Sequence, residues 1–167
     1  MGWLGGSEEF AREIFKAGPI GVASRSGGQT STVAWSLMMS GLGFTTAMHV
    51  GAEPVVGLSF AEVLPLFEED KETKAVVLFG EIGTVAEEEA AEVVREGRFT
   101  KPLVAYIAGR NLPSGMRFSH ASAIIERGRG TAESKVKALE SVGAHIVERP
   151  EEIASTLLKI LKGGEKK

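Results

Sequence analysis

Short, continuous apolar runs alternate along this sequence with longer segments of helical spacing. A continuous run, unlike an alternating one, predicts a strand that is buried on both faces of its sheet. Five strand–helix units in succession predict a parallel sheet with right-handed crossovers. We therefore expect an α/β fold of the flavodoxin-like type, a three-layer sandwich around a five-stranded parallel sheet in the order 2-1-3-4-5. The expected strands are Ile20–Ser24, Phe44–Val50, Ala75–Phe79, Leu103–Ala108 and His145–Glu148.

The segments between these strands carry helix start signals as well as helical spacing. Thr84-x-x-Glu87 matches a capping box, in which each side chain would bind the other residue's backbone amide. The glutamates of this segment (Glu87–Glu89, Glu92 and Glu96) are interpreted as the solvated face of the helix, without a catalytic role. The expected helices are Glu8–Lys16 with Ser7 as its cap, Gln29–Ser40, Ser59–Glu69, Thr84–Glu96, Thr131–Ser141 and Pro150–Leu161.

Length and composition exclude several classes of protein. The chain has 167 residues and no cysteine, so disulfides are excluded. Its formal net charge of −3 argues against nucleic-acid binding. No apolar run approaches the roughly 18 residues of a membrane span, and no signal peptide is present, so we expect a cytoplasmic protein without membrane contact. Abundant Glu, Lys and Arg beside one Asn and one Gln resemble the composition of thermophile proteins. We expect one domain over residues 18–162, an N-terminal extension with a short helix (1–17) and a frayed tail (163–167).

The segment after the first strand is the first candidate for a ligand site, because ligands of parallel α/β sheets bind beyond the carboxyl ends of the strands. In this segment, Ser24–Ser31 (SRSGGQTS), glycines permit close backbone approach and the next helix presents free N–H groups. Together with the helix dipole, these features predict an anion site for phosphate. The alternative is a glycine-rich turn with hydroxyl caps. The motif of a nucleotide-binding P-loop is absent.

Two further residues near the same expected edge suit phosphoryl chemistry. Glu81 follows the third strand between glycines, where a carboxylate can accept a hydrogen bond from a ligand or a histidine. His120 lies in a long irregular segment after the fourth strand and is a candidate nucleophile toward phosphoryl groups. Spacing alone does not decide between these roles and two simpler ones, in which Glu81 is a solvated loop glutamate and His120 an inert loop histidine. His49 and His145 are assigned to packing or capping, and no metal is expected, because no His, Asp or Glu pair has a metal-ligand spacing.

These segments, in the same order, resemble the C-terminal ligase domain of the succinyl-CoA synthetase alpha subunit. The resemblance covers about Gly18 to Leu161 and rests on SRSGGQT, GAEPVVG, GEIGTVAEEEAAE, TKPLVAYIAGRNLPSGMRFSHASAII and GRGTAESKVKALESVGAHIV. In that family, one histidine carries a phosphoryl group while an acid, CoA and a nucleoside triphosphate become acyl-CoA, nucleoside diphosphate and phosphate. The resemblance implies that His120 is this histidine and that Glu81 hydrogen-bonds it. It also implies phosphate binding by the loop residues Ser24, Arg25, Ser26, Gly27 and Gly28.

The resemblance further implies partner chains. The family's alpha subunit begins with a CoA-binding Rossmann domain, and a separate ATP-grasp (beta-type) subunit binds the nucleotide; 167 residues leave no room for either. We therefore expect this chain to bind no cofactor itself, with CoA and the Mg²⁺-bound nucleotide held by partner domains in a hetero-oligomer. Trp3 and Leu4 could pack on the chain's own body or on another subunit, so a homo-oligomer is an open alternative.

Two other functions are kept as alternatives. The family pattern around the histidine is GHAGA, whereas this chain has Ser119-His120-Ala121-Ser122-Ala123. The two added hydroxymethyl groups motivate a paralogue that has lost catalysis and acts as a binding or regulatory subunit. SRSGGQTS also resembles a flavin phosphate loop. The strand-end segments lack an aromatic residue to stack on a flavin, however, because Trp3, Trp35 and Tyr106 lie elsewhere.

Overall fold

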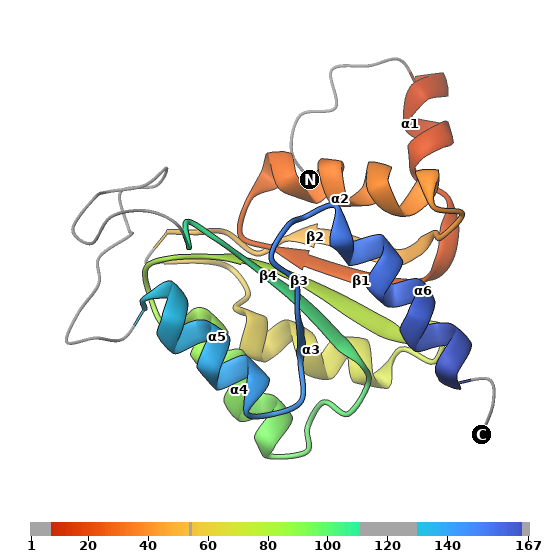
Figure 1. Cartoon of the computed structure of the whole chain (residues 1–167). Helices are drawn as coiled ribbons and strands as arrows, with labels where there is room; N and C mark the ends of the chain where they lie inside the picture. Colours follow the sequence, from red (N-terminus) through yellow and green to blue (C-terminus); the bar gives the residue numbers. More distant parts are fainter. Residues whose placement is uncertain (1–7, 54, 111–129, 165–167) are drawn as a thin grey trace.

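Five parallel strands form the centre of the protein in the order β2-β1-β3-β4-β5, which confirms the predicted fold class and strand order. The computed structural model describes residues 8–53, 55–110 and 130–164 (Figure 1). β3 continues to Glu81 instead of ending at Phe79, so that Glu81 is the last residue of a central strand. The strands are β1 (Ala17–Ser24), β2 (Phe44–His49), β3 (Ala75–Glu81), β4 (Leu103–Ala108) and β5 (His145–Ile146).

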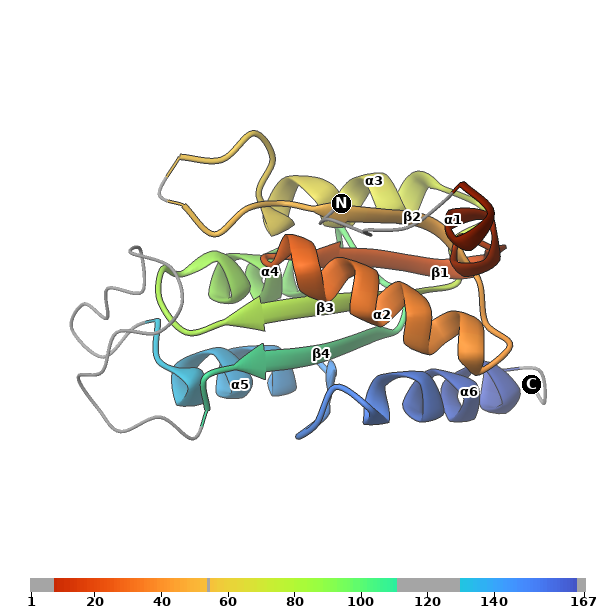
Figure 2. The ribbon, with the colours of Figure 1, turned by 90° about the horizontal axis from the view of Figure 1, so that it is seen from above.

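Helices cover both faces of this sheet and complete the predicted three layers (Figures 1 and 2). On one face lie α1 (Glu8–Ile14), α2 (Gly27–Met39) and α6 (Glu152–Gly164); on the other lie α3 (Phe60–Glu69), α4 (Ala86–Arg95) and α5 (Ala132–Glu140). α6 extends past its predicted end at Leu161. The predicted cap Ser7 and the residues Trp3 and Leu4 lie outside the described residues.

The central strand β3 separates two apolar cores. Val76 and Leu78 belong to the core beneath α3, α4 and α5, whereas Val77 and Phe79 belong to the core beneath α2 and α6. Every residue of β3 is buried, as a continuous apolar run predicts, while the edge strand β2 is partly exposed along its length. Among the helices that the structure describes, none combines the length and the hydropathy needed to cross a membrane.

The start of α4 differs from the sequence prediction. The helix begins at Ala86 after the N-cap residue Val85, no side chain caps it, and Thr84 has a φ of +54°, in the left-handed region. The predicted Thr84–Glu87 capping box is therefore wrong. The same type of box does form at α3, where the Ser59 amide donates to Glu62 Oε2 at 2.8 Å.

The glutamates of α4 divide between the protein interior and solvent. Glu89, Glu92 and Glu96 are exposed, as a solvated face predicts. The interpretation was wrong for Glu87 and Glu88, which are 0% and 9% exposed. Glu87 precedes the buried Ala90 and Ala91 by three and four residues, so helical spacing places it on the inward face.

Candidate functional site

The carboxyl ends of the strands meet at one edge of the sheet, at the left of Figure 2. There β1 passes into α2 through the segment that the sequence predicts to bind an anion. Ser26 caps α2 by accepting the Gln29 amide at 3.4 Å, and Ser24 Oγ donates to the Ser26 carbonyl at 2.9 Å. The first turn of α2 contains no acidic residue, and a Cβ added at Gly28 would meet nothing within 4 Å. The positive end of this helix is therefore open to an anion.

Arg25 crosslinks three of the strand ends. It is 2% exposed, and its Nη1 donates to the carbonyls of Glu81 at 3.2 Å and Gly83 at 2.8 Å. Its Nη2 donates to the Ala52 carbonyl at 3.1 Å. His49 Nε2, at the end of β2, lies 3.0 Å from the Arg25 carbonyl oxygen. These contacts fix the loops after β1, β2 and β3 relative to one another; a role of Arg25 in phosphate binding stays a prediction.

Glu81, at the end of β3, is 6% exposed and lies directly beside Arg25. Its Oε1 is 3.7 Å from Arg25 Nη2. Its backbone amide donates to Glu87 Oε1 at 3.0 Å. The structure thus brings two of the predicted site segments together, the loop after β1 and Glu81. His120, the third predicted site residue, lies outside the described residues.

Lys135 of α5 forms a buried ion cluster with two glutamates of α4. It is 0% exposed, contacts Glu87 Oε2, and lies 3.2 Å from Glu88 Oε2. Glu88 Oε1 accepts the Gly130 amide at 2.9 Å and the Ser134 hydroxyl at 2.8 Å. Burial acts to raise the pKa of Glu88, but the Lys135 charge, the Gly130 amide and the Ser134 hydroxyl together leave that pKa below its usual value.

Sequence analysis missed this cluster. Helical spacing relative to Ala90 and Ala91 would have placed Glu87 inward, but the local capping-box pattern pointed to the opposite orientation. Lys135 precedes the buried Leu139 by four residues, so the same spacing places it inward, but its partners lie 47 and 48 residues earlier in the chain and no local pattern identifies them.

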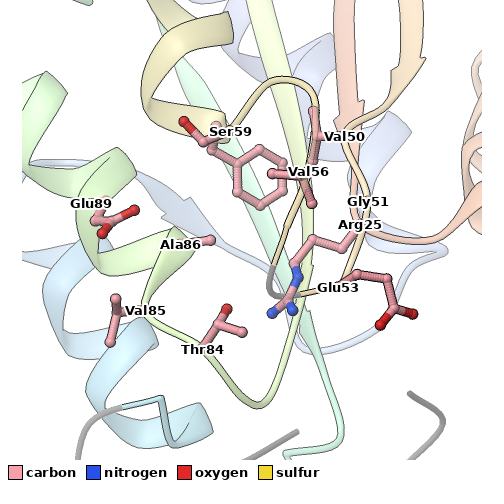
Figure 3. Close-up of a pocket in the computed structure, with 11 residues that line it drawn as sticks. Arg25, Val50, Gly51, Glu53, Val56, Ser59, Thr84, Val85, Ala86 and Glu89 are labelled. Carbon is pink, nitrogen blue, oxygen red and sulfur yellow. The ribbon is translucent and has the colours of Figure 1, made fainter. Parts of the chain in front are cut away.

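A cavity of about 300 Å³ lies at the same edge, between the loop after β2 and the start of α4 (Figure 3). Arg25, Val50, Val56, Phe60 and Thr84 contribute to its lining, and Glu53 and Glu89 add two carboxylates. Glu89 belongs to the first turn of α4, and its carboxylate and that of Glu53 make this part of the edge unfavourable for an anion.

The other two histidines, His49 and His145, are not candidates for the nucleophile. His145 is exposed at the start of β5, at the opposite end of its strand from the candidate site, and His49 binds backbone as described above. Within residues 8–53, 55–110 and 130–164, no group of three or more His, Asp or Glu side chains is arranged to hold a metal ion.

Comparison with known sequences identifies the family to which the chain belongs. The profile of the CoA-ligase family matches residues 23–145, which include the loop after β1, Glu81 and the α4–α5 cluster. The chain therefore belongs to the CoA-ligase family, as the resemblance predicted.

Curated relatives include the alpha 2 subunit of an ADP-forming succinate–CoA ligase from Archaeoglobus fulgidus. It is 52% identical over 149 residues, which cover 89% of this chain and 51% of that protein. A subunit of an ADP-forming sulfoacetate–CoA ligase from Acholeplasma is 43% identical over 154 residues, covering 92% of this chain and 52% of that protein. The chain thus spans about half the length of the curated relatives it matches.

Among solved structures, the fold matches ATP citrate lyase from Methanothrix soehngenii, determined in complex with citrate and coenzyme A. The TM-score is 0.83 at 24% identity, and the match covers 95% of this chain and 27% of the lyase chain. At this identity the match supports the fold alone.

Proposed function

We propose that this chain is the phosphohistidine-carrying domain of an NDP-forming acyl-CoA synthetase. In this reaction, a ring nitrogen of His120 takes the γ-phosphoryl group of the nucleotide, with a P–N bond formed and the bond to the diphosphate broken. The phosphoryl group then passes to the carboxylate of the acid, and the thiol of CoA displaces phosphate from the acyl phosphate. Partner chains supply the nucleotide and CoA sites: an ATP-grasp subunit and a CoA-binding Rossmann domain.

The observation that carries this proposal is the pairing of Glu81 with the open end of α2. Arg25 joins these two features, with its Nη2 3.7 Å from Glu81 Oε1 and its backbone at the start of the glycine-rich turn. A phosphorylated imidazole adds about two negative charges, and a helix N-terminus without acidic residues stabilises them. The Glu81 carboxylate suits the opposite role, to accept the N–H of the imidazole and fix its tautomer.

The names of the relatives indicate the class of acid. Succinate carries two carboxylates, and sulfoacetate carries a carboxylate and a sulfonate. Both are short acids with one group to activate and a second anionic group. We infer a small acid of this dianionic class as the substrate of the assembled enzyme.

The test is the intact mass of the chain at alkaline pH, where phosphohistidine survives. The chain is incubated with ATP, Mg²⁺ and an ATP-grasp partner subunit. We expect an acid-labile gain of about 80 Da that disappears in His120→Asn and persists in the matched control His145→Asn, at an exposed histidine at the opposite end of its strand from the site. No gain, with a partner that phosphorylates another alpha subunit, would contradict the proposal and favour a paralogue without catalysis.

A further inference from the structure

Five buried or nearly buried charged side chains form a row of alternating sign that leads away from the proposed site. In order, the row consists of Glu81, Arg25, Glu87, Lys135 and Glu88, and each member forms an ion pair with the next. All five residues are at most 9% exposed. Burying ion pairs adds little net stability compared with apolar packing, because each charge loses its hydration. The row therefore calls for an explanation other than stability.

Glu87 fixes the end of β3 from one side. Its Oε1 accepts the Glu81 amide at 3.0 Å and lies 3.4 Å from Arg25 Nη1. Arg25 in turn binds the carbonyl and the carboxylate of Glu81. Gly80 makes this approach feasible, because a Cβ at that position would meet Glu87 Oε1 at 2.5 Å. The backbone and the side chain of Glu81 are thus both oriented through Glu87 and Arg25.

Lys135 fixes the same turn from the other side. It holds Glu88, whose Oε1 accepts the Gly130 amide at 2.9 Å. The Gly130 carbonyl accepts the Gly83 amide at 2.8 Å, two residues after Glu81. One lysine therefore supports the last residue of β3 and a residue within the β3–α4 turn, through two different glutamates.

We propose that Glu87, neutralised by Lys135, is a positioning residue that orients the Glu81 carboxylate for its work on the phosphoryl-carrying histidine. This inference rests on the proposed function for its catalytic consequence. The placement of Glu81 by Glu87 is a property of the chain itself and can be measured separately.

Two double variants test the inference, and they differ only in the side chain at residue 87. Glu87→Leu with Lys135→Met removes one charge of each sign and the acceptor of the Glu81 amide. Glu87→Gln with Lys135→Met removes the same charges but keeps an amide oxygen there. Lys137→Met, on the exposed face of α5, is the single-site control.

The first readout is hydrogen exchange of the Glu81 amide in the isolated chain. We expect exchange about tenfold faster in the Leu/Met variant than in the Gln/Met variant, because only the former lacks an acceptor. The second readout is the phosphorylation of His120 by ATP, Mg²⁺ and the ATP-grasp partner. At saturating partner, we expect the Leu/Met rate to fall about ten- to a hundredfold while the half-saturating partner concentration stays unchanged. The Gln/Met variant should recover most of the rate.

The outcomes separate the two proposals. If the wild-type chain is never phosphorylated, the proposed function fails, while the exchange measurement still decides whether Glu87 positions Glu81. If the wild type is phosphorylated and the two folded double variants match each other in exchange and in rate, the inference is overturned. If the Leu/Met variant does not fold, Gly80→Ala replaces it, because its added Cβ displaces the Glu87 carboxylate directly. Unchanged exchange and rate in Gly80→Ala would equally overturn the inference.

Discussion

Two neighbouring strands, β1 and β3, each pass into a helix at the same edge of the sheet, yet the two helix starts are built in opposite ways. α2 begins with a serine cap and two glycines, without an acidic residue in its first turn. α4 begins without a side-chain cap and has three glutamates in its first turn. Helix N-termini attract negative charge in both cases. The first turn of α2 has no carboxylate of its own, whereas the first turn of α4 holds three carboxylates of the chain.

This difference shows how one fold can direct an anion to one of two similar positions. Topology alone gives both turns the same access to ligands beyond the strand ends. The acidic first turn of α4 makes its end unfavourable for phosphate, and the buried row from Glu87 to Lys135 instead braces the site. Under the proposed function, the turn after β1 would bind the phosphoryl group and the turn after β3 would position Glu81.

The largest effect is expected when the ion cluster of Glu87, Glu88 and Lys135 loses its lysine. Lys135→Met leaves Glu87 and Glu88 buried without their shared partner, so we expect the free energy of unfolding to fall by about 3–5 kcal/mol. Urea denaturation at pH 7 measures this change. Lys137→Met is the control and should shift stability by less than about 0.5 kcal/mol. Equal stabilities of the two variants would mean that the cluster contributes no structural support.

The sequence was sufficient to predict the sheet and its strand order, because the strands are continuous apolar runs and the crossover rules leave few topologies. It was also sufficient to place Glu81 and the Ser24–Gly28 loop at one edge, since parallel strands bring their carboxyl ends together. The prediction for Glu87 was wrong because two sequence signals disagree there: helical spacing relative to Ala90 and Ala91 points the side chain inward, whereas the capping-box pattern points it to the helix start. The pattern Thr84-x-x-Glu87 is a valid local signal, but a buried lysine on another helix provides a competing partner that local patterns do not contain.

A second prediction concerns Gly130, which joins Glu88 of the ion cluster to Gly83 in the turn after β3. Gly130 has a φ of +78°, and a Cβ there would lie 2.6 Å from the Thr84 carbonyl oxygen. Gly143 has a similar φ of +84° but open space around it. We expect Gly130→Ala to cost about 2–4 kcal/mol and Gly143→Ala about 1 kcal/mol, because only the first adds a clash to the backbone strain. Thermal unfolding compares them; costs of the same size would show that the Gly130 contact is not tight.

The third prediction concerns how the stabilising contribution of Glu88 depends on pH. The pKa of Glu88 is lower in the folded chain than in the unfolded chain, so its contribution is complete above the unfolded value of about 4.3 and is lost as pH falls through the folded value. We expect Glu88→Gln to lose about 1–2 kcal/mol at neutral pH and to converge with the wild type in acid.

Urea denaturation from neutral to acidic pH measures that difference. The comparison of two proteins is needed because the pKa values of Glu62, Glu68, Asp70 and Glu152 are also lowered and give both proteins a common slope. Glu89→Gln, on the exposed face of α4, is the matched control. If the difference in free energy of unfolding between the wild type and Glu88→Gln grew as pH falls, the lowered pKa of Glu88 could not be its cause.

The smallest change in stability should come from making the start of α2 resemble the start of α4. Gln29→Glu places a carboxylate in the first turn, at the residue whose amide Ser26 caps. We expect the free energy of unfolding to rise by about 0.5 kcal/mol, because the carboxylate interacts favourably with the helix dipole. The same carboxylate competes with a bound phosphoryl group, so phosphorylation of His120 by the partner should slow. Thr32→Glu, on the exposed surface beyond the first turn, is the control and should leave the rate unchanged. A stabilised Gln29→Glu variant that is phosphorylated at the wild-type rate would show that the anion is stabilised elsewhere, and that the open end of α2 is not what distinguishes the two turns.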